Sequence, residues 1–238
     1  MIKSRTKHYY KKYNLKNNRM KPLIVINFKT YREASGDNAL KLAANIRKVR
    51  RSKYQIVMVP PMLTVREIAK KNTHKVFAQY VSPYTYGSHT GSIMLEELKN
   101  SGVTGTLLNH SEKKLPFKVL TETIELCKKS KITTIVCAST INEAKKVANL
   151  KPNYIAYEPK ALIGGDISVT EADPDIIIKV IKAVKSVNRN TKVLVGAGVH
   201  SKEDLGHALL LGAHGVLIGH AVAKAKNPKR FLTEMLIS

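Results

Sequence analysis

The stretch KVLVGAGVHSKEDLGHALLLGAHGVLIGH, residues 192–220, contains a complete strand–helix–strand unit. It opens with an apolar run that ends in a glycine-rich turn, and it closes with a second run of the same kind, residues 215–220. Between the two runs, Ser201 and Asp204 have the spacing of a capping box, which marks the start of a helix. Both runs are continuously apolar instead of alternating, as is typical of parallel strands that are covered on both faces.

The same rhythm extends over most of the chain. A capping-box spacing at Thr140 and Glu143 marks another helix start. Asp173 and Asn227 each precede a proline, which is typical of a first helical turn. The helical segments after the third and the eighth apolar run are short. The eight runs are LIVINF (23–28), QIVMV (55–59), VFAQY (76–80), GTLLNH (105–110), ITTIVCAS (132–139), YIAYE (154–158), KVLVGAG (192–198) and GVLIGH (215–220).

Alternating strands and helices predict an α/β fold built on a parallel sheet. Eight units within 238 residues suit a single-domain (β/α)8 barrel, in which the sheet closes on itself. An open doubly wound sheet is the alternative, but residues 27–36 after the first run lack the GxGxxG fingerprint of dinucleotide-binding sheets. We therefore expect the barrel over residues 20–238, preceded by a basic and mobile N-terminal extension, residues 1–19.

The chain is strongly basic, with a net charge of +24 at neutral pH. The extension holds seven of the 41 lysines and arginines and none of the 17 acidic residues, so the remainder is basic as well. This charge favours a negatively charged partner, either a nucleic acid or a small phosphorylated substrate. No apolar run has the length of a membrane span, and the N-terminus lacks the apolar centre of a secretory signal. We expect a cytoplasmic protein without membrane contacts, in which Cys127 and Cys137 are reduced thiols.

Polar side chains gather where the predicted strands end. In a barrel of this kind, the chemistry lies at the carboxyl ends of the strands. The first run leads to Lys29, the fourth ends in His110 and the sixth in Glu158, and the last two end in glycine-rich turns. A cation, an imidazole and a carboxylate are thus expected on one rim, beside small residues that can admit a phosphate.

This set of residues favours the abstraction of a proton next to a carbonyl group. Glu158 would remove the proton, while His110 and Lys29 would stabilise the negative charge that develops on oxygen. The glycine-containing loop after Pro159 could close over the site and exclude water. Taken singly, each residue has an ordinary structural explanation as a salt-bridged, solvated or core side chain, so the functional interpretation depends on the joint pattern.

Five motifs at the ends of the predicted strands resemble those of the triosephosphate isomerases, and they occur in the right order. Residues 87–91 and 105–112 resemble the compact archaeal branch of that family in particular. The resemblance covers almost everything from Met20 to Ser238. It implies a (β/α)8 TIM barrel that interconverts glyceraldehyde 3-phosphate and dihydroxyacetone phosphate through an enediolate, without a cofactor. The motifs are NFK (27–29), NHSE (109–112), YEP (157–159), IGG (163–165) and GAG (196–198).

The resemblance also implies a role for individual positions. Lys29 would be the electrostatic catalyst, His110 the electrophile and Glu158 the base. Family members are oligomers, so a homotetramer or a homodimer is expected. Asn27 would orient the substrate, Glu112 would support the site, and Thr90 would reach towards a neighbouring subunit's active site. Backbone amides would hold the phosphate near Gly164, Gly165, Gly198, Gly219 and His220.

Two positions depart from the family's pattern. The loop usually reads Gly-Thr-Gly where this chain has Gly164, Gly165 and Asp166, and an acid that pointed inward would repel a phosphate dianion. The last turn usually carries small residues, whereas this chain has His220, which could clash with the phosphate or add a donor. Both changes bear on phosphate affinity, and neither touches the three residues expected to catalyse the reaction.

Two other functions stay open from the sequence. A barrel lyase or synthase would share the glycine-rich turns but would not need Lys29, His110 and Glu158 together. A basic binding protein would use the extension to hold nucleic acid, and the binding would weaken steeply as the salt concentration rises. We expect nucleic acid to bind only through this extension. The histidines lack the spacing of metal ligands, so no metal site is expected.

Overall fold

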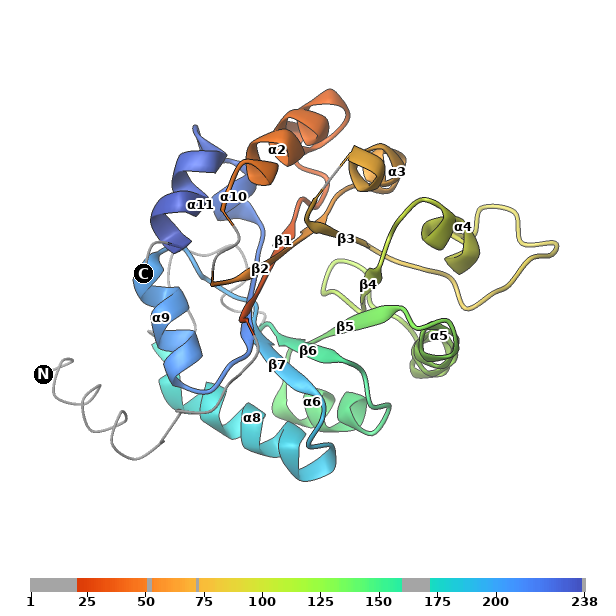
Figure 1. Cartoon of the computed structure of the whole chain (residues 1–238). Coiled ribbons are helices and arrows are strands. Elements are labelled where there is room, and N and C mark those ends of the chain that lie inside the picture. Colours follow the sequence, from red (N-terminus) through yellow and green to blue (C-terminus); the bar gives the residue numbers. More distant parts are fainter. Residues whose placement is uncertain (1–20, 51–52, 72, 160–171, 237–238) are drawn as a thin grey trace, which may run out of the picture.

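Eight parallel strands form a closed barrel (Figure 1) in the computed structural model, which describes residues 21–50, 53–71, 73–159 and 172–236. Neighbouring strands pair in chain order, and the barrel closes where β1 pairs with β8, with Leu23 opposite Gly215. The predicted single-domain (β/α)8 barrel is therefore confirmed, and the open sheet is excluded. The strands are β1 (Leu23–Asn27), β2 (Gln55–Val59), β3 (Lys75–Ala78), β4 (Gly105–Leu108), β5 (Thr133–Ala138), β6 (Tyr154–Tyr157), β7 (Lys192–Val195) and β8 (Gly215–Ile218).

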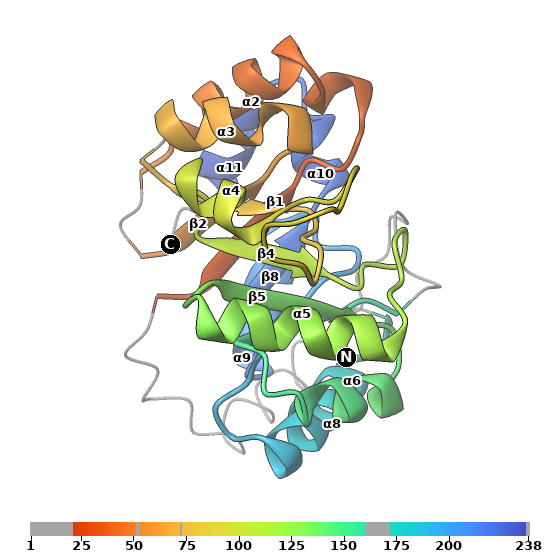
Figure 2. The ribbon, with the colours of Figure 1, turned by 90° about the vertical axis from the view of Figure 1, so that its right-hand side faces the viewer.

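A ring of helices surrounds the barrel and covers the outer faces of its strands (Figures 1 and 2). The helices that follow the third and the eighth strand are short, as expected, with six residues in α4 and four in α10. The helices are η1 (Arg32–Ala34), α2 (Asp37–Arg47), α3 (Met62–Lys71), α4 (Leu95–Asn100), α5 (Phe117–Lys129), α6 (Ile141–Ala148), α8 (Pro174–Val187), α9 (Lys202–Leu210), α10 (His220–Ala223) and α11 (Pro228–Leu236).

The hydrophobic core has two layers. One layer fills the barrel with strand side chains such as Val25, Phe77 and Leu194. The other layer lies between the strands and the helices. Because the strands are buried on both faces, their sequences are continuously apolar. Both cysteines are buried free thiols, and burial raises the pKa of Cys127 to about 12, which keeps that thiol protonated at neutral pH.

The helix starts follow the sequence signals with one change. Ser201 and Asp204 form a complete capping box at α9. At α6, the Thr140 hydroxyl accepts the backbone N–H of Glu143, but the Glu143 carboxylate accepts from Ser139 instead of Thr140. The predicted capping box at Thr140 is thus only half formed, because the carboxylate reaches one residue further back along the chain.

Part of the predicted organisation lies outside the described residues. This holds for the extension, residues 1–19, and for the loop positions Gly164, Gly165 and Asp166. The extension therefore stays a prediction. Within the ranges that the structure describes, no helix is both long and apolar enough to cross a membrane.

The interior of the barrel leaves no room for a side chain at Gly105. A Cβ atom there would lie 2.5 Å from the Phe77 ring on the neighbouring strand. Gly105→Ala is expected to lower the free energy of unfolding by about 1–3 kcal/mol, the usual effect of overpacking. In a Phe77→Leu background the loss caused by Gly105→Ala should be smaller, and denaturant titration of the two single variants and the double variant measures this coupling.

Gly206→Ala is the matched control for this prediction, because a Cβ atom at that α9 position meets no atom within 4 Å. Alanine in a helix interior is expected to raise stability by about 0.5–1 kcal/mol over glycine. An equal loss from Gly105→Ala with and without the Phe77 ring would contradict the proposed clash.

Candidate active site

The residues predicted at the strand ends meet in one hollow at the carboxyl ends of the strands. Its lining includes a cation, an imidazole and a carboxylate from three strand ends, together with two glycine-rich turns. Gly164 and Gly165 lie outside the described residues, and Thr90 lies in the exposed segment between β3 and α4. The predicted residues that line the hollow are Asn27, Lys29, His110, Glu158, Gly198, Gly219 and His220.

Glu158 follows β6 and is only 4% exposed. Its Oε1 lies 3.6 Å from His110 Nε2, and its Oε2 has no hydrogen-bond partner within the described part of the chain. Gly196 leaves the space for this side chain, because a Cβ atom there would lie 2.4 Å from Glu158 Cγ. A buried carboxylate with an unsatisfied oxygen is costly for the fold, so the position points to a function in the hollow.

The tautomer of His110 follows from its surroundings. The backbone N–H of Glu112 donates to His110 Nδ1 at 3.2 Å, so Nδ1 is the acceptor of a neutral ring. The ring proton then lies on Nε2, which is the nitrogen nearer to Glu158. His110 can therefore donate a hydrogen bond into the hollow.

Lys29 has a strained backbone that two side chains hold in place. Its φ of +51° lies in the left-handed region, which a lysine rarely adopts. Asn27 Oδ1 accepts from the Lys29 N–H at 3.0 Å, and Gln79 Nε2 donates to the Lys29 carbonyl at 2.8 Å. Asn27, expected to orient the substrate, therefore also shapes the turn that carries Lys29.

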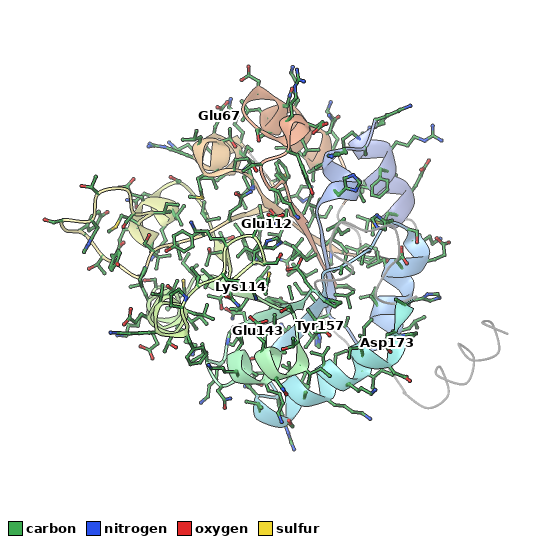
Figure 3. All side chains as sticks on the ribbon, turned by 180° about the vertical axis from the view of Figure 1, so that it is seen from behind. Glu67, Glu112, Lys114, Glu143, Tyr157 and Asp173 are labelled. Atoms are coloured by element: carbon green, nitrogen blue, oxygen red, sulfur yellow. The ribbon has the colours of Figure 1, made fainter. Side chains whose placement is uncertain are left out.

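The ammonium group of Lys29 is paired with Glu112. Its Nζ lies 2.6 Å from Glu112 Oε1, and the lysine side chain is 14% exposed. Burial alone would lower the pKa of Lys29, but the hydrogen bond and the charge of Glu112, with smaller contributions from Tyr31 and Glu158, raise it above its usual value. Lys29 therefore carries a full positive charge at neutral pH. Figure 3 labels Glu112 near the middle of the barrel when it is viewed from the end opposite to Figure 1.

The opposite side of the hollow is formed by the turns after β7 and β8. Gly198 has a φ of +65°, which favours glycine, and Gly219 leaves room for Lys29, whose Cε would be 3.4 Å from a Cβ there. The exposed His220 ring meets the ring of Tyr31 edge to face at a centroid distance of 6.3 Å. Lys29 and Lys224 lie over the same Tyr31 ring, at 5.8 and 5.0 Å, so this side of the hollow is positively charged.

Two residues of the site, Gln79 and Tyr31, were not singled out from the sequence, and the role of a third, Gly196, was not foreseen. Gln79 contacts Lys29 from a segment 50 residues further along the chain. Tyr31 contacts Lys29 from within the same turn, which has no recognisable motif. Gly196 was visible as part of a glycine-rich turn, but its role in making space for Glu158 depends on the pairing of β6 with β7. Within the described ranges, no group of His, Cys, Asp and Glu side chains is arranged to hold a metal ion.

A charged network lies beside the hollow, between the turn after β4 and the start of α6. Glu143 Oε1 accepts from Lys114 Nζ at 2.6 Å, and Oε2 accepts from the Ser139 N–H at 2.7 Å and from its hydroxyl at 2.9 Å. Burial alone would raise the pKa of Glu143, but these bonds outweigh it and hold the pKa below the usual value. The carboxylate is therefore ionised at neutral pH.

Comparison with known proteins adds to this geometry. A family model described as triosephosphate isomerase matches residues 22–236. A protein named triosephosphate isomerase from Methanobrevibacter smithii is 39% identical over 216 residues, which cover 90% of this chain and 97% of the relative. Proteins of the same name from Methanocaldococcus jannaschii and Methanothermus fervidus are 42% and 37% identical, and the matches cover 90% and 91% of this chain and 98% of each relative.

Glu143→Gln is expected to reduce stability in a pH-dependent way. A carboxyl group with a lowered pKa in the folded state stabilises the fold above its unfolded pKa, and this contribution is lost as the pH falls through the folded pKa. At pH 7 the variant should unfold with a free energy about 1–2 kcal/mol lower than the wild type, as for a charged hydrogen bond. The difference should shrink below about pH 4, and urea titration at several pH values measures it.

Glu125→Gln, an exposed position on α5, is the control. It should change stability little at any pH, as most exposed substitutions do. A Glu143→Gln effect that stayed constant from pH 7 to pH 3 would contradict an ionised carboxylate as its cause.

Proposed function

The chain belongs to the triosephosphate isomerase family, and from this premise we propose that it interconverts D-glyceraldehyde 3-phosphate and dihydroxyacetone phosphate with Glu158 as the base. The observation that carries the proposal is the buried Glu158 carboxylate, whose Oε2 has no partner in the described residues and which shares its hollow with Lys29 and His110. A barrel lyase or synthase gives no reason for this combination at three strand ends.

The proposed reaction moves one proton between two neighbouring carbons and one between their oxygens, and it needs no cofactor. Glu158 takes the proton from the carbon next to the substrate's carbonyl group, and the electron pair moves into an enediolate. His110 donates a hydrogen bond from Nε2–H to the oxygen that gains negative charge, and the Lys29 ammonium group stabilises the same charge. In the enediolate, His110 gives its Nε2 proton to the negatively charged oxygen and takes the hydroxyl proton from the neighbouring oxygen, so the ring ends neutral again. Glu158 then returns its proton to the neighbouring carbon, which converts the aldose into the ketose or the reverse.

The turns after β7 and β8 are the proposed phosphate site. The lining by Gly198, Gly219 and His220 and the positive charge of Lys29 and Lys224 nearby support this assignment. Backbone N–H groups in such turns bind anions without a side chain of their own. Gly164 and Gly165, outside the described residues, are proposed to add further amides when the substrate is bound.

We also propose a homo-oligomer, either a tetramer or a dimer, in which Thr90 approaches a neighbouring subunit. The segment between β3 and α4 that carries Thr90 projects from the barrel (Figure 1), and its Tyr86 side chain is 65% exposed. An exposed aromatic side chain on a projecting loop is a common feature of subunit contacts. Asn27 is proposed to orient the substrate, and Glu112 to support Lys29 and His110.

Glu158→Gln is expected to lower kcat for glyceraldehyde 3-phosphate isomerisation by at least a thousandfold, because the amide has no basic oxygen at neutral pH. KM should change much less, since the variant keeps the shape of the side chain. A coupled assay that follows dihydroxyacetone phosphate formation measures both constants.

Glu125→Gln removes the same charge at an exposed α5 position and should retain wild-type kcat. If Glu158→Gln kept more than a tenth of the wild-type kcat, another group would have to act as the base. If the folded wild type had no isomerase activity, the proposed reaction itself would be wrong.

A further inference from the structure

The turn that carries His110 begins with a residue in an unfavourable backbone conformation. Asn109 follows β4 directly, is 5% exposed and has a φ of +57°. Asparagine tolerates this left-handed region better than most residues, but the conformation still costs free energy compared with glycine. The strain is placed immediately before His110, so other contacts must hold the turn in this shape.

The side-chain amide of Asn109 supplies three such contacts. Nδ2 donates to the Cys137 carbonyl at 2.9 Å and to Glu143 Oε1 at 3.0 Å. Oδ1 accepts from the Leu115 N–H at 3.1 Å. The amide therefore ties the end of β4 to the end of β5, to the first turn of α6 and to the far end of its own turn, residues 109–115.

Glu143 is a fixed anchor for this amide. Its backbone N–H donates to the Thr140 hydroxyl, which caps α6, and its Oε2 accepts two bonds from Ser139. Its Oε1 accepts from Asn109 and also from Lys114, which belongs to the same turn as His110. Through these two bonds, Glu143 attaches the turn to α6 both at its first residue, Asn109, and near its last, at Lys114. Lys114 and Glu143 are labelled in Figure 3.

None of Asn109, Lys114, Ser139 and Glu143 is among the residues that line the hollow. Their effect on a substrate must therefore pass through the residue that they hold. Between Asn109 and Lys114, the residue that faces the hollow is His110. Its ring is also fixed from within the same turn, by the Glu112 N–H at Nδ1.

We propose that Asn109 is a positioning residue for catalysis, whose amide, anchored on Glu143, sets the place of His110 Nε2 relative to Glu158. The inference rests on the proposed function, since it matters only if His110 acts on the substrate. Misplacement of a reacting group by about 1 Å can lower a rate by about a hundredfold. A purely structural role would lower stability without changing the kcat of the folded enzyme.

Asn109→Gly is the variant that separates the two roles. Glycine adopts the left-handed conformation without strain, so the turn can still form, but the three side-chain bonds are lost. We expect kcat to fall by about tenfold to a hundredfold with KM changed by less than about threefold, because a displaced donor affects the transition state more than binding. The ¹⁵N NMR signals of the His110 ring should also change, since the Glu112 N–H bond to Nδ1 would be weakened.

Lys131→Gly is the matched control. Lys131 has the same φ of +57° but precedes β5, at the end of the barrel opposite to the hollow. It should keep wild-type kcat and unchanged His110 signals. An equal loss of kcat in both variants would overturn the proposal, and so would a wild-type kcat with unchanged His110 signals in Asn109→Gly.

Two further variants keep the outcome decisive. Should Asn109→Gly fail to fold, Glu143→Gln weakens the same anchor, and it should lower kcat by about threefold to tenfold and shift the His110 signals. Unchanged kcat and signals in that variant would overturn the proposal. His110→Gln separates this inference from the proposed function. If this variant retains full activity, the proposed role of His110 is wrong. If His110→Gln loses activity but Asn109→Gly does not, only the positioning role of Asn109 is refuted.

Discussion

The site depends on keeping one carboxylate buried at the end of a strand. Burying a charge is costly unless it is paired, and Glu158 is almost enclosed with one oxygen unsatisfied within the described residues. The side chain fits there because β7 is followed by Gly196, whose missing side chain leaves the required space. Since all eight strands run parallel, the same closure brings the ends of β1, β4 and β6 to one rim. The fold thus buries the Glu158 carboxylate at a cost in free energy, and it also places Lys29 and His110 beside it in the hollow.

Backbone strain at this rim is balanced by polar contacts. Lys29 lies two residues beyond the end of β1, and Asn109 directly follows β4. Both residues have left-handed backbone conformations. The strain at Lys29 is held by bonds from Asn27 and Gln79, and the strain at Asn109 by its own amide. The bond from Gln79 and the bond to the Cys137 carbonyl join the strained turns to the ends of other strands, whereas the bond to Asn27 is local. Strained residues persist only where the surroundings over-determine them, so these contacts are what hold the two turns in their left-handed conformations.

The fold was predictable because burial on both faces of a strand leaves a direct mark, the continuous apolar run. The strand-end residues followed from the fold, since only eight positions had to be considered. Contacts between distant segments left no such mark: the space at Gly196 and the bond from Gln79 depend on which strands are neighbours. At α6, the spacing of Thr140 and Glu143 predicted the helix start but not the choice of Ser139 by the carboxylate. Asn109 carried a usable signal, because asparagine after a strand is typical of a left-handed turn.

The pairing of charges at the rim explains why a lysine and a buried acid can share one hollow. If the Lys29 ammonium group paired with Glu158, it would occupy the carboxylate that is proposed to take the proton. Instead, the Lys29 ammonium group lies 2.6 Å from Glu112, whose side chain is 56% exposed and therefore ionised at low cost. The backbone N–H of Glu112 also makes Nδ1 of His110 the acceptor, which turns the Nε2 proton towards Glu158. One solvent-facing acid thus leaves the cation charged, the imidazole neutral and the buried carboxylate free to accept a proton.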